Sequence, residues 1–315
     1  KHDLKFINIM NDDASINDNA PKKYIGQSRF DAREQIVNDI EKAGLLEKTE
    51  KYLHTVGYSE RGDVPIEFYM SDQWFMKMSE LVKPAIEAVE AGEIRFHPAH
   101  WVKTYNHWMK NIKDWCISRQ LLWGHQIPVW YHKNDSAKIH VSVNGPKDKE
   151  NWYQDSDVLD TWASSWIWPM GVHDWPKDSK DLSKFYPTNT LVTGPDIIFF
   201  WVARMIITGY EFLDQKPFTD VYFTSILRDE TGKKLSKSLG NFYTMKDLKG
   251  RNFSAESIRF QLLSGHYRTK ISFSLGKKIE SDKVIQRIND FYRILVKNGA
   301  NDKIGNNLPD VYIEF

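Results

Sequence analysis

The sequence predicts an α/β fold built on a parallel sheet whose strands are joined by crossover helices. Between about residues 95 and 245, short runs rich in β-branched and aromatic residues alternate with amphipathic stretches, a pattern typical of this class. Residues 191–193 are predicted to form a buried strand, and residues 221–227 a second one. Between them, residues 197–207 are apolar almost all round, which predicts a helix inside the core.

The elements before this region are predicted from alternation and from helix-end signals. Residues 6–10 alternate as a short strand does. Ser28 and Asp31 form a capping box that opens a helix, and Gly44 follows its end. The apolar face of this helix is expected to consist of Ile36, Val37 and Ile40.

A second helix is predicted over residues 76–91, with Gly92 just past its end. Pro84 inside this stretch predicts either a kink or a late start. The side chains expected to face inward are Leu81, Ile86 and Val89. Residues 132–151 are polar and contain Asn-Gly-Pro, which predicts a surface insertion.

Composition narrows the class of protein. The 315 residues have room for two or three domains, and an apolar content of 41% suffices for their cores. With 43 basic and 42 acidic residues the formal net charge is +1, so nucleic-acid binding would need a local basic patch. The single cysteine excludes a disulfide framework and a cysteine-cluster zinc site. There is no apolar run of membrane-spanning length and no recognisable signal peptide, so we expect a cytoplasmic protein.

A basic motif follows the second predicted strand. Lys234 and Lys237 are three residues apart and are interleaved with Ser236 and Ser238. Lysine ammonium groups are compact, mobile charges that can follow phosphoryl oxygens as charge develops on them, and Gly240 permits a tight turn. The spacing fits a loop that closes over a polyphosphate, but it also fits an ordinary solvated turn.

A second candidate site lies where the strand at 191–193 meets the following helix, at Gly194-Pro195-Asp196. Ligands of open parallel sheets bind outside the carboxyl ends of the strands, and helix N-termini attract phosphate. Asp is also a favoured helix N-cap. The residues alone therefore leave nucleotide binding and helix capping equally open.

Four motifs resemble one family. Residues 234–238, Lys-Leu-Ser-Lys-Ser, resemble the Lys-Met-Ser-Lys-Ser signature of the class I aminoacyl-tRNA synthetases, with Leu in place of Met. The other three resemble the catalytic core of the valyl-tRNA synthetases. They are Asp-Trp-Cys-Ile-Ser-Arg-Gln at 114–120 with its continuation to 128, Asp-Val-Leu-Asp-Thr-Trp at 157–162, and Asp-Ile-Ile-Phe-Phe-Trp-Val-Ala-Arg-Met at 196–205. This resemblance runs from about residue 6 to residue 241.

The resemblance implies a domain order. Residues 1–75 would be a remnant of the editing domain with the return to the core. Residues 76–245 would be the second half of a Rossmann-type catalytic domain. Residues 246–315 would be a helical region that lies toward the tRNA. Amino acid, with valine favoured, and tRNA are the implied partners.

The resemblance also implies an ATP site. Gly194 would pack against the adenosine and Asp196 would face the ribose. Lys234 and Lys237, the catalytic pair, would neutralise the α- to γ-phosphates while the amino-acid carboxylate attacks. The implied ATP-binding set is Gly194, Asp196, Lys234, Ser236, Lys237 and Ser238. Mg²⁺ would accompany the nucleotide, with ATP phosphates and water as its main ligands.

The implied amino-acid pocket consists of Trp162, Ile197 and Trp201. Ile197 and Trp201 are four residues apart, which predicts one shared helical face. Apolar residues at this spacing are more often core, and it is the resemblance that favours a pocket. An apolar slot of this kind would reject threonine only about 100-fold, which gives such enzymes a need for editing.

Two further motifs are missing. No His-x-Gly-His signature is present, and His97-Pro98-Ala99-His100 has its spacing without its glycine, so we expect a structural role for these residues. The resemblance implies that the other half of the nucleotide site lies in a missing N-terminal half. Ser59 stands where some relatives carry a cysteine knuckle, so no zinc is expected.

Three functions stay open at this point. The first is the second part of a valine-type synthetase, incomplete as an isolated chain. The second is an inactive, truncated paralogue that binds adenine nucleotide or tRNA. The third is a cysteine-type synthetase, because residues 242–268 resemble cysteinyl-tRNA synthetases, although one cysteine cannot supply the thiolates of their zinc site.

Overall fold

Three parallel strands organise the larger compact unit of the chain. In the computed structural model, which describes residues 4–59, 62–236, 240–267 and 269–298, β2 (Arg95–His97), β10 (Phe218–Phe223) and β9 (Thr188–Thr193) form a sheet in the order β2-β10-β9. Both pairings of β10 are parallel, with Val221 opposite Phe96 and Leu191. The predicted α/β class with a parallel sheet and crossover helices is confirmed.

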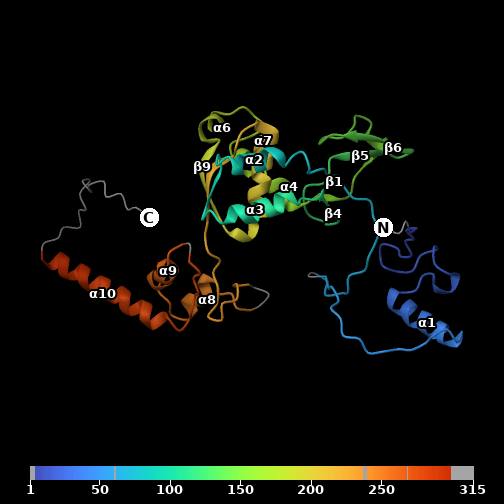
Figure 1. Ribbon diagram of the computed structural model, residues 1–315, viewed down its shortest axis with the longest axis horizontal. Helices are drawn as coiled ribbons and strands as arrows, with labels where there is room; N and C mark the ends of the chain where they lie inside the picture. Colours follow the sequence, from blue (N-terminus) through green and yellow to red (C-terminus); the bar gives the residue numbers. More distant parts are fainter. Residues whose placement is uncertain (1–3, 60–61, 237–239, 268, 299–315) are drawn as a thin grey trace. The chain divides into compact units, whose positions relative to one another are not determined.

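Helices pack on one face of this sheet (Figure 1). They are α2 (Lys83–Glu90), α3 (Trp101–Lys110), the π-helix η4 (Ile198–Val202) and α7 (Ala203–Leu213). The core between them is fully buried at Tyr105, Ile206, Phe218 and Val221. Within the described part of the chain the opposite face is left open. Leu191 and Thr193 face the helices, whereas Val192 points the other way and is 60% exposed. The prediction of a buried strand at 191–193 is therefore wrong for its middle residue.

The helix predicted over 76–91 begins late. Pro84 lies in the first turn of α2, where its missing N–H costs nothing, so the helix runs from Lys83 to Glu90. Gly92 has a φ of +77° just past the helix end, as expected for a helix terminator. The buried face includes Ala85, Ala88 and Val89, and Leu81 and Ile86 pack against the same core.

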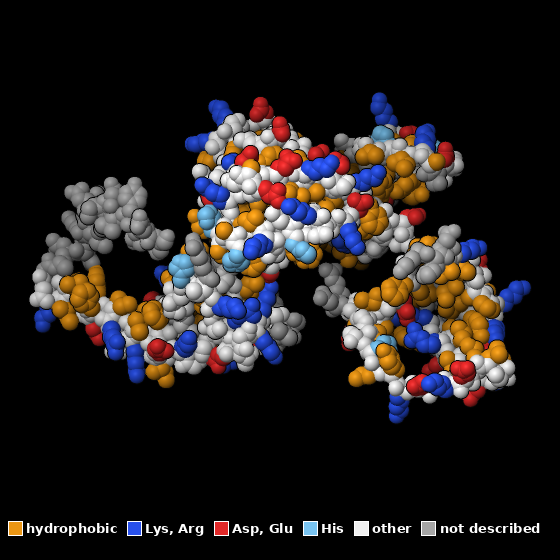
Figure 2. Space-filling model, in the orientation of Figure 1, with side chains coloured by type: hydrophobic (Ala, Val, Ile, Leu, Met, Phe, Trp, Pro, Cys, Tyr) orange, Lys and Arg blue, Asp and Glu red, His pale blue; other side chains and the backbone are white. Residues whose placement is uncertain are grey.

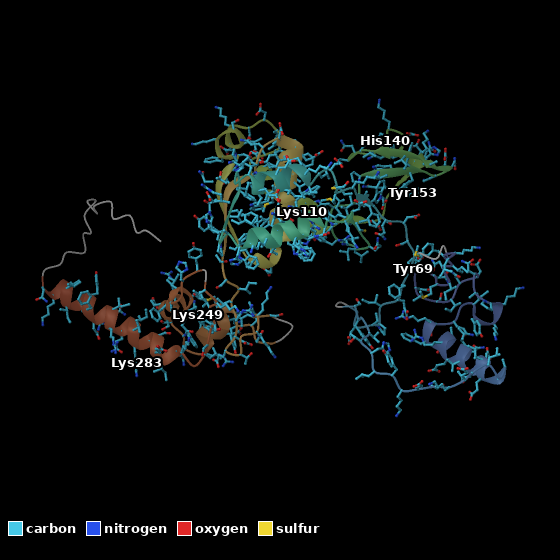
Figure 3. The ribbon with its side chains drawn as sticks, in the orientation of Figure 1. Tyr69, Lys110, His140, Tyr153, Lys249 and Lys283 are labelled. Atoms are coloured by element: carbon cyan, nitrogen blue, oxygen red, sulfur yellow. The ribbon has the colours of Figure 1, made fainter. Side chains whose placement is uncertain are left out.

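Three small antiparallel sheets are formed by other described strands of this unit. The predicted insertion at 132–151 is not simply a loop, because β6 (Asp135–Val141) pairs with β5 (Val129–His132), which also pairs with β7 (Trp152–Gln154). Figure 3 shows His140 and Tyr153 on this sheet. The remaining strands are two residues each: β1 (Phe75–Met76) pairs with β3 (Trp115–Cys116), and β4 (Ser118–Arg119) pairs with β8 (Val158–Leu159).

The other helices are short, with one exception. The elements are η2 (Lys149–Asn151), α4 (Thr161–Ser165), α5 (Trp168–Gly171), α6 (Lys180–Phe185), η3 (Pro195–Ile197), α8 (Met245–Gly250), α9 (Ala255–Leu263) and the 20-residue α10 (Lys278–Lys297). Of these, α8, α9 and α10 follow β10 and form a C-terminal group (Figure 1).

A second core lies under the C-terminal helices. Leu248, Phe253, Ile258 and Phe273 are buried in it, and Leu227, Tyr243 and Leu275 pack against it. Two of these, Leu227 and Tyr243, lie on either side of the lysine motif. This core therefore fixes the base of the loop that carries the motif.

The chain divides into two compact units, Lys1–Gln73 and Trp74–Phe315. In the first, Ser28 Oγ accepts a hydrogen bond from Asp31 N at 3.2 Å and opens α1 (Arg29–Lys42), as predicted. The predicted strand at 6–10 is wrong, since Met10 alone of these residues forms a bridge, to Ile16. The predicted apolar face of α1 is wrong as well. Ile36, Val37 and Ile40 are exposed, because Ala32 is the one residue of the helix that is buried in the small core with Ile16 and Tyr24. A short helical turn, η1, spans Lys22–Tyr24.

Candidate active site

A cavity of about 430 Å³ lies at the carboxyl ends of the three parallel strands. The strands of a parallel sheet point the same way, so the residues that follow them gather at one edge. Pro98, His100 and Trp101 follow β2, and Pro195 and Asp196 follow β9. The last residue of β10 and the chain after it supply Phe223, Thr224, Ser225, Ile226 and Arg228, and a later segment supplies Lys270.

Asp196 is brought to this cavity by a close approach to Gly194. Gly194 is the N-cap of η3, with a φ of −84° that any residue can adopt. A Cβ atom built on it would lie only 2.6 Å from Asp196 Oδ1. A larger residue at position 194 would therefore displace the Asp196 carboxylate from the position it occupies. Asp196 itself does not cap η3, so the helix-capping interpretation of this residue is wrong.

Lys234 meets Asp196 at the same edge. Its Nζ donates a hydrogen bond to Asp196 Oδ2 at 2.8 Å, and the two side chains are 57% and 41% exposed. Lys234 stands on the return arm of a hairpin whose outgoing arm carries Arg228, because the two residues form an antiparallel bridge. Two residues that the sequence places 38 positions apart thus lie in direct contact.

Asn241 holds the base of this loop. Its Nδ2 donates to Asp229 Oδ2 at 2.8 Å and to the Lys234 carbonyl at 3.2 Å, while its Oδ1 accepts from the Ser236 N–H at 2.8 Å. Gly240, with a φ of +65°, makes the expected turn. Lys237 and Ser238 lie outside the described residues.

Asp229 is the second residue that holds the base of this loop. The hydrogen bond from Asn241, followed by those from Thr231 and from the Lys233 N–H, lowers the pKa of the Asp229 carboxyl to about 2. Hydrogen bonds that favour the charged form of a carboxyl act in this direction. The arms of the hairpin are therefore tied by a carboxylate that stays ionised at any ordinary pH.

The three proposed pocket residues lie elsewhere. None of Trp162, Ile197 and Trp201 lines the cavity at the sheet edge. Trp162 stacks on Phe200 with ring centroids 5.8 Å apart, and Trp201 Nε1 donates to the Ser165 carbonyl at 2.9 Å. Trp162 and Trp201 also pack against the main core.

The expected α-helical face shared by Ile197 and Trp201 is not present. Ile197 ends η3 and Trp201 lies inside the π-helix η4. A π-helical turn changes the angular relation between residues four apart and is frequent at functional sites. An apolar run without a polar face carries no signal that separates a π-helical turn from an α-helical one.

A buried polar cluster supports the helix that carries Trp162. Asp160 Oδ1 accepts the Trp162 N–H at 3.1 Å and caps α4. Asp160 Oδ2 accepts from Arg119 Nη2 at 2.6 Å and from Trp115 Nε1 at 3.0 Å. Asp160 is only 7% exposed. The carboxylate therefore ties together the segments that carry Trp115, Arg119 and Trp162.

Arg204 lies behind this cluster. Its guanidinium stacks on the Trp115 ring at 3.6 Å, and its Nη1 has no hydrogen-bond partner among the described residues. Burial lowers the pKa of Arg204 to about 10, against the opposing effect of the Asp160 charge. The Arg204 cation thus depends on an aromatic face and on a nearby carboxylate.

Sequence reasoning missed part of the cavity. His97 has the expected structural partners, since its Nε2 is 2.7 Å from Asp220 Oδ1 and its ring stacks on Tyr222. His100, also expected to be structural, is one of the residues that line the cavity. Its position just after a strand of the parallel sheet was the available signal. No comparable signal marked Lys270, which lies far along the sequence.

Metal binding is limited by the available ligands. Among the residues that the structure describes, no group of three His, Cys, Asp or Glu side chains could hold a metal ion. Asp196 is the carboxylate in the cavity lining, so Mg²⁺ at this place would need ATP phosphates and water for its other ligands. Within the same residues, no helix combines the length and apolarity needed to cross a membrane.

The fold and the site define a class of protein. A family model described as tRNA synthetases class I (I, L, M and V) matches residues 7–145 and 134–274, and the chain belongs to this family. The second match includes residues 242–268. The methionyl-tRNA synthetase of Mycobacterium tuberculosis, bound by methionyl-adenylate, has the same fold. It is 17% identical with a TM-score of 0.51, over 74% of this chain and 40% of that one.

Curated relatives indicate the member of the family. The valine--tRNA ligase of Chlorobaculum tepidum is 54% identical over 249 residues, which are 76% of this chain and 27% of the relative. The valine--tRNA ligase of Bacillus licheniformis is 50% identical over 267 residues, 84% of this chain and 30% of the relative. The chain thus spans less than a third of the length of these relatives.

Proposed function

We propose that the chain supplies the ATP-binding side of a valine--tRNA ligase of the cytoplasm. The observation that carries this proposal is the meeting of Asp196 and Lys234 beside the cavity at the carboxyl edge of the sheet. A carboxylate suits the ribose hydroxyls of a nucleotide, and an ammonium suits its phosphates. The identity with valine--tRNA ligases supports valine as the amino acid.

The proposed reaction has two steps. In the first, a carboxylate oxygen of valine attacks the α-phosphorus of ATP, the bond from that phosphorus to the β-phosphate oxygen breaks, and pyrophosphate leaves. In the second, a terminal ribose hydroxyl of tRNA attacks the carbonyl carbon of valyl-adenylate and AMP leaves. The first step needs no side-chain base because the valine carboxylate is already ionised.

The described residues have separate parts in the first step. Asp196 holds the ribose, and Lys234 leaves Asp196 to neutralise charge on the phosphates. Lys237, beyond the described residues, is proposed as its partner. Gly194 leaves room for the nucleotide. Removal of one preorganised donor, such as the ammonium group of Lys234, costs roughly 100- to 1,000-fold in rate. Mg²⁺ bound with the nucleotide would supply further neutralisation of phosphate charge, with Asp196 as the protein carboxylate at the cavity.

The amino-acid pocket is proposed at Trp162, Ile197 and Trp201. Trp162 is fixed by Asp160 through the cap of α4, and Trp201 by its hydrogen bond to Ser165. Both rings are partly buried against the core. Rigid rings of this kind can define a small apolar slot, which admits valine and excludes larger side chains by size.

Titration of the chain with ATP, followed by tryptophan fluorescence with and without valine, tests the function. We expect ATP to bind, and valine to tighten ATP binding while leucine does not. Binding of ATP without any effect of valine would indicate a nucleotide-binding paralogue instead. Absence of ATP binding would contradict the proposal.

A complementation experiment tests the catalytic step. Addition of the upstream part of a relative in trans should restore pyrophosphate exchange that depends on valine. Lys237→Ala should abolish this gain, and retained activity in that variant would contradict the role of the lysine motif.

A further inference from the structure

Lys270 lines the same cavity as Asp196, although it belongs to the segment after α9. The backbone on both sides of it is fixed to the chain that follows β10. The Ser225 N–H donates to the Tyr267 carbonyl at 3.0 Å, and the Arg228 N–H donates to the Ile271 carbonyl at 3.1 Å. The Phe273 N–H completes the pairing with the Arg228 carbonyl at 2.9 Å. Lys270 is therefore held at the cavity by its backbone.

Packing reinforces this position. Phe273, three residues beyond Lys270, is buried in the second core with Phe253, and Leu227 of the paired segment packs against the same core. Ser272 forms a parallel bridge with Arg228, which is also the antiparallel bridge partner of Lys234. Three adjacent segments thus each carry one cation toward the edge of the sheet.

The charges at this edge are unbalanced. Arg228 and Lys270 are cations in the cavity lining, and Asp196 is the carboxylate there. A third cation, Lys234, lies beside the cavity in contact with Asp196. Lys234 pairs with Asp196, whereas Arg228 Nη1 donates to the neutral Gly232 carbonyl. Among the residues that the structure describes, none forms an ion pair with Lys270.

A cavity with an excess of positive charge favours a polyanion. Its volume of about 430 Å³ falls in the range of sites for small molecules, about 300–1,000 Å³. A triphosphate whose adenosine end lies at Asp196 would need cations at its other end. Lys270 is a lining residue of this cavity and can supply such a charge.

We propose that Lys270 is a further binding residue for the polyphosphate of ATP, placed in the site by the backbone pairing of Tyr267, Ile271 and Phe273 with Ser225 and Arg228. This inference rests on the proposed function. It adds a cation from outside the lysine loop to the residues proposed to bind the phosphates. The segment after α9 is then part of the nucleotide site and not only a support for it.

The test compares dissociation constants for ATP, AMP and adenosine in the wild type and in variants of the full chain. Lys270→Ala should weaken ATP binding about tenfold, near the lower end for a hydrogen bond between charged groups. It should leave the affinity for adenosine and AMP unchanged, and Lys270→Arg should restore most of the ATP affinity. Lys249→Ala is the matched control, because Lys249 is an exposed lysine on α8 (Figure 3) and does not line the cavity.

Several outcomes would overturn the proposal. Equal ATP affinity of Lys270→Ala and the wild type would remove Lys270 from the site, while loss of binding in Asp196→Ala would leave the proposed function intact. An equal loss for adenosine, AMP and ATP would place Lys270 at the nucleoside end and would contradict its role at the polyphosphate. Unchanged ATP affinity with weakened tRNA binding would make it a tRNA contact. Failure of the wild type to bind ATP would contradict both proposals.

Discussion

Lys234 and Asp196, 38 residues apart in the sequence, form an ion pair of 2.8 Å at the carboxyl edge of the parallel sheet. These residues are proposed to bind opposite ends of one ATP molecule. An ion pair this exposed is worth about 0–1 kcal/mol. Breaking the pair therefore costs little when Lys234 binds a phosphate and Asp196 binds the ribose.

The first prediction concerns this exchange. Lys234→Ala should weaken ATP binding, because a cation for the phosphates is lost. The same variant should leave adenosine binding unchanged or strengthen it by up to about fivefold, because Asp196 no longer pairs with an ammonium. Asp196→Ala should weaken both ligands. Calorimetric titration measures all four constants, and a loss of adenosine affinity in Lys234→Ala would show that the pair does not compete with the nucleoside.

Gly194 carries the second prediction. Gly194→Ala should fold normally, because its φ of −84° suits alanine. The added Cβ would lie 2.6 Å from Asp196 Oδ1 and must displace this carboxylate. We expect about a tenfold loss of ATP affinity with an unchanged melting temperature. Gly250→Ala is the control, since a Cβ there meets nothing within 4 Å. ATP affinity equal to that of the wild type would show that the carboxylate can relax.

The chemistry of the site could be predicted further than its geometry. Lys234 and Asp196 were recognised as candidates because a motif marks each one, and the strand before Asp196 was visible as a β-branched run. Their direct contact could not be predicted, since it depends on parallel strands that end at one edge. The position of Lys270 in the cavity could not be predicted either, because it also depends on tertiary structure. Its position follows from backbone hydrogen bonds between two irregular segments, which side-chain patterns do not encode.

Other limits were local. Pro84 correctly indicated the late start of α2, because the missing N–H of proline acts on the backbone itself. The strand predicted over residues 221–227 extends too far, because β10 ends at Phe223. The next residues, up to Leu227, leave the sheet and pair with the segment around Tyr267 and Ile271. Their β-rich composition suits either partner, so composition alone could not locate the end of the strand.

The third prediction concerns pH. The pKa of Asp229 lies at about 2, below the ordinary value of about 3.9. Because the folded pKa is depressed, the stabilising effect of this carboxylate is fully present above pH 3.9, decreases as the pH falls, and is lost below about pH 2. Carbon NMR titration of the carboxyl group should show this midpoint.

Asn241→Ala should raise the midpoint toward 3.9, because the hydrogen bond from Asn241 is the largest cause of the shift. Asp13 serves as the internal control. Its pKa is lowered by hydrogen bonds from Ser15 in the other compact unit and should not move. A midpoint for Asp229 that is unchanged by Asn241→Ala would show that the Thr231 and Lys233 hydrogen bonds suffice to hold the loop.

The fourth prediction concerns the support of the proposed amino-acid pocket. Asp160→Asn places an amide among the donors Arg119 Nη2, Trp115 Nε1 and the Trp162 N–H, so at least one of them loses its acceptor. It also removes the negative charge that favours the buried Arg204 cation. We expect a loss of about 2 kcal/mol in the free energy of unfolding, a moderate value because Arg119 is partly exposed.

Urea denaturation measures this loss, with Asp157→Asn as the matched control. Asp157 accepts a hydrogen bond from Gln120 Nε2 at the exposed surface, so its replacement should cost less than about 0.5 kcal/mol. Because Asp160 also caps the helix that carries Trp162, the valine effect on ATP binding should weaken in Asp160→Asn even at temperatures where the variant is folded. A destabilised variant with an unchanged valine effect would separate the stability of α4 from recognition of the amino acid and would place the pocket away from Trp162.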